Sequence, residues 1–199
     1  MDILKTTDPA TASQWMQDGK LLAYPTESVW GIGCDAFNEQ AVKKILTIKN
    51  RPIEKGLIVV TDSIKRLNPI LVELSTSQKQ TLTDSWQNND NKQQASTWVL
   101  PIPANIKVPS WIIGKHNNIA VRVIAHPLIK QVCKNMVSAD NPFGFIVSTS
   151  CNPTTNLPAT NYNEAFAYFG NDIGYLMGDT LAYTKPSQIK DVVTGHILR

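Results

Sequence analysis

The chain has 199 residues, of which 42% are hydrophobic and 18% are charged. This composition suits one globular domain with a full core and excludes a disordered chain. The formal net charge of +3 permits an anionic ligand such as a nucleotide or RNA but does not require one. No stretch approaches the roughly 18 apolar residues of a membrane-spanning helix. Residues 1–20 contain no apolar segment followed by a cleavage site, so we expect a cytoplasmic protein without a membrane partner.

The first half of the chain alternates helix and strand patterns. We expect a helix over 9–19 closed by a glycine, and a strand over 21–24. From Asn38 to Lys49 the apolar residues recur at helical spacing, and Asn38 is a suitable N-cap. Pro52 ends this helix, and the β-branched run that follows predicts a buried strand over 57–60.

The second half continues the alternation. We expect a helix at 63–74 that Pro69 interrupts, a second helix at 77–86, a polar loop at 87–96, and strands at 97–101 and 119–124. A helix from His126 to Met136, a strand at 143–149, a short helix at 163–169 and final strands at 175–178 and 187–198 follow. Strands that alternate with helices along the chain are typical of the α/β class.

Three stretches concentrate polar side chains at the ends of these elements. The connection after the second helix presents three cations at the edge of a buried element: Lys49, Arg51 and Lys55. The alternative interpretation is that these cations only stabilise the C-terminus of the helix. The strand at 143–149 ends in hydroxyls and a carboxamide, where α/β proteins often bind ligands, or where a Ser/Thr turn satisfies its own backbone. Thr26 lies in a strand-end loop, where its hydroxyl has the alternative of a local backbone bond.

Charged and metal-ligating residues elsewhere give weaker signals. Arg122 lies within an apolar run, so we expect either a structural salt bridge or a clamp on a substrate carboxylate. Glu27 could serve as a base or a cap, but the sequence shows no partner for it. The spacing of the cysteines and histidines matches no metal or redox motif, so we expect buried thiols and no protein metal site. The residues concerned are Cys34, Cys133, Cys151, His116, His126 and His196.

Several motifs together resemble the YrdC/TsaC family of threonylcarbamoyl-AMP synthases. They are Tyr24-Pro25-Thr26-Glu27 with Gly31-x-Gly33-Cys34-Asp35, then Lys49-x-Arg51-Pro52, then Ser148-Thr149-Ser150-x-Asn152, and finally Thr194-Gly195-x-x-Leu198-Arg199. The resemblance covers nearly the whole chain in the family's order. It implies a single YrdC-like domain over 1–199, of the α/β class (α+β in some schemes). Such a domain has three layers, with a twisted mixed sheet flanked by helices and a deep cleft.

The resemblance also implies an activity. Family members are nucleotidyltransferases that condense L-threonine, bicarbonate or CO2, and ATP to threonylcarbamoyl-AMP and pyrophosphate. The product feeds N6-threonylcarbamoyladenosine modification of tRNA through a separate transferase complex, so tRNA or double-stranded RNA is a further expected partner. Mg2+ is expected to arrive with ATP, because no cluster of acidic residues suggests a protein cage for it.

The resemblance assigns roles to individual positions. It implies that the catalytic residues are Lys49, Arg51, Ser150 and Asn152. ATP would be bound by the same four residues together with Thr97 and Arg199. Threonine would be bound by Thr26, Arg122, Ser148 and Ser187.

Two segments depart from the family pattern. Relatives place Pro-Gly-Pro after the tryptophan that matches Trp86, close to the nucleotide pocket, whereas this chain has the polar stretch 87–96. The segment 153–156 lacks the Ser-Gly that relatives often have. These departures motivate the alternative of a degenerate nucleotide-binding paralogue. A second alternative is a non-catalytic RNA-binding module that acts in tRNA or ribosome maturation.

Overall fold

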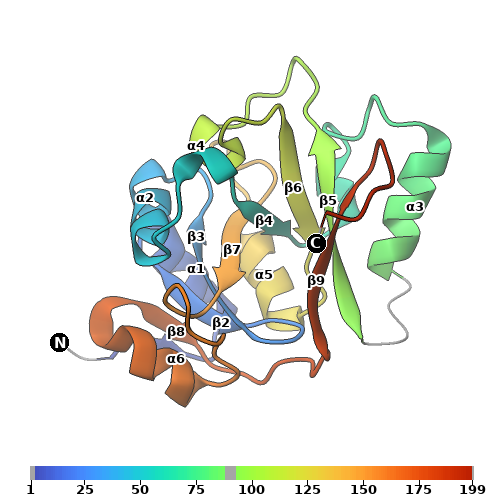
Figure 1. Ribbon diagram of the computed structural model, residues 1–199. Helices are drawn as coiled ribbons and strands as arrows, with labels where there is room; N and C mark the ends of the chain where they lie inside the picture. Colours follow the sequence, from blue (N-terminus) through green and yellow to red (C-terminus); the bar gives the residue numbers. More distant parts are fainter. Residues whose placement is uncertain (1–2, 88–92, 199) are drawn as a thin grey trace.

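A computed structural model describes residues 3–87 and 93–198 of the chain (Figure 1). Its α-helices are α1 (Pro9–Gln17), α2 (Glu39–Ile48), α3 (Thr76–Gln87), α4 (Ser110–Ile113), α5 (Pro127–Asn135) and α6 (Tyr162–Phe169). Its strands are β1 (Lys5–Thr6), β2 (Leu22–Pro25), β3 (Trp30–Asp35), β4 (Ile58–Thr61), β5 (Gln94–Pro101), β6 (Asn118–Val123), β7 (Ile146–Ser150), β8 (Gly174–Leu176) and β9 (Lys185–Asp191). Short 3-10 turns at Ile53–Lys55, Ile64–Leu67 and Gly170–Asp172 complete the described elements.

The strands in the described residues form one sheet of mixed direction. Their order is β1-β8-β2-β3-β7-β4-β6-β5-β9. The central strands β2, β3, β7 and β4 pair antiparallel, whereas β4 with β6 and β5 with β9 pair parallel. The expected mixed sheet is therefore confirmed.

Helices pack on both faces of this sheet. On one face, α1 and α5 lie side by side over an apolar cluster that contains Met16, Leu22 and Ile129. On the other face, a larger cluster takes in Ile45 of α2 and Phe169 of α6. Successive residues of β2 alternate between the two clusters, as the period of a strand requires. The three-layer α/β architecture is confirmed.

The helix α2 forms as its sequence predicts. The side chain of Asn38 caps it by accepting a hydrogen bond of 3.0 Å from the amide of Ala41. The apolar residues of its buried face are fully or almost fully enclosed: Ala41, Val42, Ile45 and Leu46. The helix ends before Lys49, so the following turn leaves the sheet face and passes toward β4.

A central strand escaped prediction. The glycine pair at 31 and 33 lies in β3, which pairs with β7 in the middle of the sheet. A Cβ atom on Gly33 would lie 1.9 Å from the carbonyl oxygen of Val147. The glycine allows two backbones to approach closely, and its low strand propensity hid the strand from the sequence pattern.

Three other predicted segments were wrong or lie partly outside the description. The expected helix at 63–74 is a 3-10 turn at Ile64–Leu67 followed by turns, because a proline interrupts it. The polar loop is shorter than 87–96, since β5 already begins at Gln94, and residues 88–92 lie outside the described residues. The last strand ends at Asp191, where the Asp191 carboxylate accepts hydrogen bonds from backbone amides of the following turn.

No helix in residues 3–87 or 93–198 is long and apolar enough to cross a membrane.

We predict that Gly33→Ala destabilises the protein by more than about 3 kcal/mol, at the upper end of overpacking effects, since backbone cannot move aside as a side chain can. Gly195→Ala is the control, because no atom of the described residues lies within 4 Å of its added Cβ, and the left-handed backbone of the alanine alone costs about 1 kcal/mol. Denaturant unfolding measures both. Equal losses in the two variants would contradict the close approach of β3 and β7.

Candidate active site

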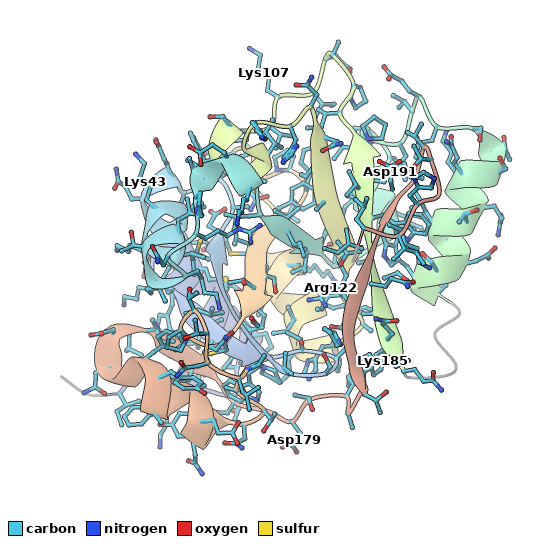
Figure 2. All side chains as sticks on the ribbon, in the orientation of Figure 1. Lys43, Lys107, Arg122, Asp179, Lys185 and Asp191 are labelled. Carbon is cyan, nitrogen blue, oxygen red and sulfur yellow. The ribbon has the colours of Figure 1, made fainter. Side chains whose placement is uncertain are left out.

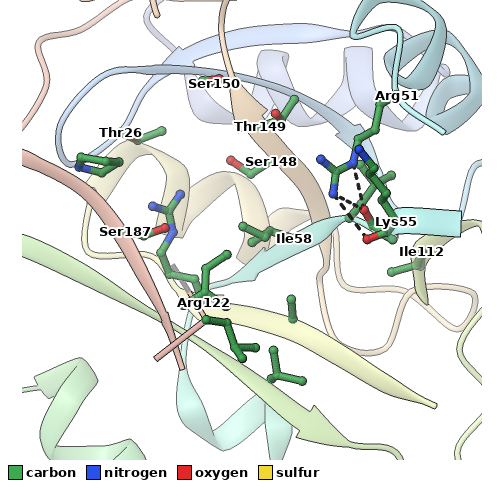
Figure 3. A pocket seen from close by; sticks show the side chains of 18 of the residues that line it. Thr26, Arg51, Lys55, Ile58, Ile112, Arg122, Ser148, Thr149, Ser150 and Ser187 are labelled. Atoms are coloured by element: carbon green, nitrogen blue, oxygen red, sulfur yellow. Dashed lines mark hydrogen bonds between the residues drawn. The ribbon is translucent and has the colours of Figure 1, made fainter. Parts of the chain in front are cut away.

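A cavity of about 790 Å³ lies against the sheet, and its wall takes residues from β3, β7, β4, β6, β5 and β9 (Figure 3). Six of the residues expected to bind substrates line it, although they come from distant parts of the chain: Thr26, Arg51, Arg122, Ser148, Ser150 and Ser187. Arg51 lies on one side of the cavity and Arg122 with Ser187 on the other, and Ser148 lies between them (Figure 3). Apolar side chains such as Ile58 and Ile112 complete the wall. A mostly apolar cavity with a few convergent polar groups is the usual form of a small-molecule site.

The first end of the cavity is cationic. The side chain of Arg51 donates from Nε and Nη2 to the carbonyl oxygen of Gly56, at 3.0 and 2.7 Å, and so closes the turn that follows α2. Gly56 adopts a left-handed φ of 62° there, a conformation that glycine reaches without strain. Lys55 lies on the same turn and lines the cavity. The turn thus presents two cations to a ligand.

Lys49 and Asn152 lie together behind this end. The ammonium group of Lys49 donates to the carbonyl oxygens of Ser150 and Asn152, at 2.9 and 2.6 Å, and to Oδ1 of Asn152 at 2.9 Å. Burial lowers the pKa of Lys49. Neither Lys49 nor Asn152 is among the described residues that line the cavity. These contacts fasten the end of α2 to the loop that follows β7.

The loop after β7 is itself held in shape. The amide of Asn152 donates from Nδ2 to the carbonyl oxygen of Asn156 at 2.6 Å, and the hydroxyl of Thr154 donates to the carbonyl oxygen of Lys49. The segment 153–156, which lacks the glycine found in relatives, therefore forms a closed turn against α2. This turn keeps Ser150 at the cavity wall.

The second end of the cavity carries hydroxyl groups. The hydroxyl of Thr26 donates to the carbonyl oxygen of Val29 at 2.6 Å, which is the local bond considered as an alternative role. Ser187 lines the cavity and accepts a hydrogen bond of 3.1 Å from the hydroxyl of Thr97. Thr97 is fully buried and lies behind Ser187, not among the described residues of the cavity wall.

Arg122 has a carboxylate partner that the sequence did not reveal. Its Nη1 atom lies 3.3 Å from Oε2 of Glu27, and both side chains are buried. The other oxygen of Glu27 accepts a hydrogen bond of 2.7 Å from the amide of Ala125. Arg122 lies near the centre of the molecule beside β9, whereas Lys43 and Lys107 project from its periphery (Figure 2). The salt bridge and the cavity position of Arg122 therefore occur together rather than as alternatives.

Some site residues were not predicted, and one cannot be placed. His116 lines the cavity from the segment before β6 and Asn118 from the first position of β6, but nothing in their sequence context marked them as site residues. Arg199, expected at the nucleotide, lies outside the described residues. Within residues 3–87 and 93–198, no three His, Cys, Asp or Glu side chains gather as metal ligands would.

Comparison with known proteins identifies the family. A family model for the Sua5/YciO/YrdC domain, described as telomere recombination, matches residues 14–199. The chain belongs to this family, as its motifs predicted. A relative from Psychrobacter cryohalolentis named threonylcarbamoyl-AMP synthase is 54% identical over 98% of this chain and 97% of its own length. The synthase of Acinetobacter baumannii is 45% identical over 98% of each chain.

Solved structures share the fold. Sua5 from P. abyssi, crystallised with L-threonine, matches all of this chain with a TM-score of 0.80 and 25% identity. This chain spans 57% of the Sua5 chain, just over half of its length. E. coli YciO matches with a TM-score of 0.75 at 16% identity, over all of this chain and 94% of its own. The YrdC-like fold is therefore confirmed.

We predict that Lys49→Met lowers the free energy of unfolding by about 2 kcal/mol, because it removes three charge-assisted hydrogen bonds and leaves their acceptors unpaired. Lys43→Met is the matched control. The Lys43 side chain is half-exposed and pairs with Glu39 on the same helix, so its loss should cost at most about 0.5 kcal/mol. Thermal unfolding followed by circular dichroism compares the two, and equal midpoints would show that Lys49 does not fasten the loop.

Proposed function

We propose that this chain is an L-threonylcarbamoyladenylate synthase that joins L-threonine, CO2 and ATP in the cavity. The observation that supports this most is that one cavity has Arg51 and Lys55 at one end and Arg122 at the other. Cations at two ends suit two anionic substrates, a triphosphate and an amino-acid carboxylate. The synthase relatives, which match almost the whole chain, support the same assignment.

Threonine is assigned to the Arg122 end. The guanidinium fits the substrate carboxylate, and the hydroxyls of Thr26, Ser148 and Ser187 surround the remaining polar atoms. Thr97 holds Ser187 from behind through its hydrogen bond. The similarity to Sua5, which was crystallised with L-threonine, supports a threonine site in this fold.

ATP is assigned to the Arg51 end, with Mg2+ bound to its phosphates as part of the substrate. Arg51 and Lys55 face the phosphates, and Ser150 donates its hydroxyl from the end of β7. Lys49 and Asn152 lie behind the Arg51 end of the cavity. When ATP binds, a phosphate oxygen takes the place of one of the protein oxygens that accept hydrogen bonds from the Lys49 ammonium group. We keep Arg199 as a further phosphate contact.

The reaction needs positioning and charge neutralisation more than covalent catalysis. The threonine amine attacks CO2 formed from bicarbonate, loses a proton and becomes a carbamate. A carbamate oxygen then attacks the α-phosphorus of ATP, a new P–O bond forms, and the bond to the β-phosphate oxygen breaks to release pyrophosphate. Preorganised cations stabilise the charge that develops on the phosphates, and the two-ended cavity keeps carbamate and phosphorus in line.

The setting of the reaction follows from its product. Threonylcarbamoyl-AMP is an activated acyl group, which a separate transferase complex passes to tRNA for N6-threonylcarbamoyladenosine. We place the protein in the cytoplasm, with residues 1–199 acting as one domain. Direct binding of tRNA or double-stranded RNA is a further proposal, supported only by the net charge of +3.

We predict that pyrophosphate release from MgATP requires both L-threonine and bicarbonate, because the carbamate is the nucleophile. The measurement is a coupled pyrophosphate assay in which each component is omitted in turn. Release without threonine, or no release under any condition, would contradict the proposal. If no pyrophosphate is released under any condition but the protein binds ATP, the degenerate paralogue is favoured. If no pyrophosphate is released and the protein binds RNA tightly, the RNA-binding module is favoured.

We predict that Arg51→Ala lowers kcat at least about 100-fold, the scale for one preorganised electrostatic contact. Arg66→Ala is the control, because Arg66 pairs with Asp62 through an ordinary i,i+4 contact outside the cavity wall. Arg51→Lys should fall between them, since it keeps the charge but cannot make both bonds to Gly56. Full activity in the Arg51→Ala variant would contradict phosphate binding at the Arg51 end of the cavity.

A further inference from the structure

The carboxylate of Glu27 lies beside the cavity without being part of its described wall. Glu27 follows Thr26 directly in the chain, and only 1% of its surface is exposed. The carboxylate is fixed through the amide of Ala125, next to the end of β6. Its backbone oxygen accepts a bond of 2.8 Å from the amide of Tyr183, in the segment that leads into β9. Glu27 therefore joins three segments that build the threonine end.

The contact between Glu27 and Arg122 is incomplete as a salt bridge. Nη1 and Oε2 lie 3.3 Å apart, but among the described residues neither Oε2 of Glu27 nor Nε of Arg122 has a hydrogen-bond partner. Burying an ion pair is rarely stabilising overall, and good geometry with every donor and acceptor satisfied is what offsets its desolvation. Stability alone is thus a poor explanation for this pair.

The geometry of the guanidinium suggests another explanation. The pair engages one Nη atom from outside the cavity, while the Arg122 side chain lines the cavity itself. A long side chain with many rotamers loses ligand affinity unless something fixes its direction. Glu27 supplies that constraint from a position that is locked on two sides by backbone amides.

We propose that Glu27 is a positioning residue that aims the Arg122 guanidinium at the carboxylate of the amino-acid substrate. This inference rests on the proposed function, because it assumes that an amino acid binds at this end. Glu27 does not touch the substrate. It acts through Arg122 and thereby sets the preference of the site for a free carboxylate.

The test compares L-threonine with L-threoninamide, in which a neutral amide of the same shape replaces the carboxylate. Calorimetry measures both dissociation constants in the presence of a non-hydrolysable ATP analogue. Wild type should prefer threonine. In Glu27→Gln this preference should fall at least about tenfold, since misplacement of a binding group by about 1 Å is enough for such losses. Glu73→Gln makes the same chemical change at an exposed position and should leave the preference unchanged.

Two further variants separate positioning from general damage. Glu27→Asp keeps the charge on a shorter side chain and should lose less preference than Glu27→Gln. In an Arg122→Gln background the preference is already lost, so adding Glu27→Gln should change it no further. A loosened fold would instead weaken both ligands equally and leave the preference intact.

The outcomes distinguish the two levels of the proposal. Wild type that binds no threonine overturns the proposed function and this inference with it. Wild type that prefers threonine, together with Glu27→Asp and any folded Glu27→Gln variant that keep the same preference, overturns only the role of Glu27.

Discussion

The close antiparallel contact between β3 and β7 is the constraint on which the site depends. Gly33 permits it, because no other residue leaves room for the carbonyl oxygen of Val147. The resulting register pairs Gly31 with Ser150 and Gly33 with Ser148. Both serines thereby reach the cavity wall from one central strand. A substitution that separated the strands would displace the hydroxyls of both proposed substrate ends together.

Around this strand pair, separate polar contacts fix the two ends of the cavity. Lys49 ties α2 to the loop after β7, and Arg51 closes its own turn on Gly56. At the other end, Glu27 and Arg122 join the loop after β2 to β6. The guanidinium groups of Arg51 and Arg122, which line the cavity, are already held by protein oxygens, so ordering these two groups costs little when substrates bind. Preorganisation of this kind is what a reaction driven by positioning requires.

The sequence predicted α1, α2, α3, α5 and α6, most strands and six of the residues around the cavity, because those features depend on local periodicity or on short motifs. It could not predict β3, whose glycines serve a contact with a strand more than a hundred residues away. The pairing of Glu27 with Arg122 is likewise non-local, so each charge alone gave only open alternatives. The same limit applies to Lys49, because its three acceptors lie on the last residue of β7 and on Asn152 in the loop that follows, about a hundred residues further along the chain.

We propose that one cavity holds threonine and ATP at opposite ends. The most direct measurement is a crystal structure of the protein with L-threonine and a non-hydrolysable ATP analogue with Mg2+. We expect the threonine carboxylate to lie within hydrogen-bond distance of the Arg122 guanidinium and the phosphates to lie against Arg51, with the amino group facing the α-phosphate. A threonine carboxylate bound at Arg51, or a triphosphate lying along Arg122, would contradict it.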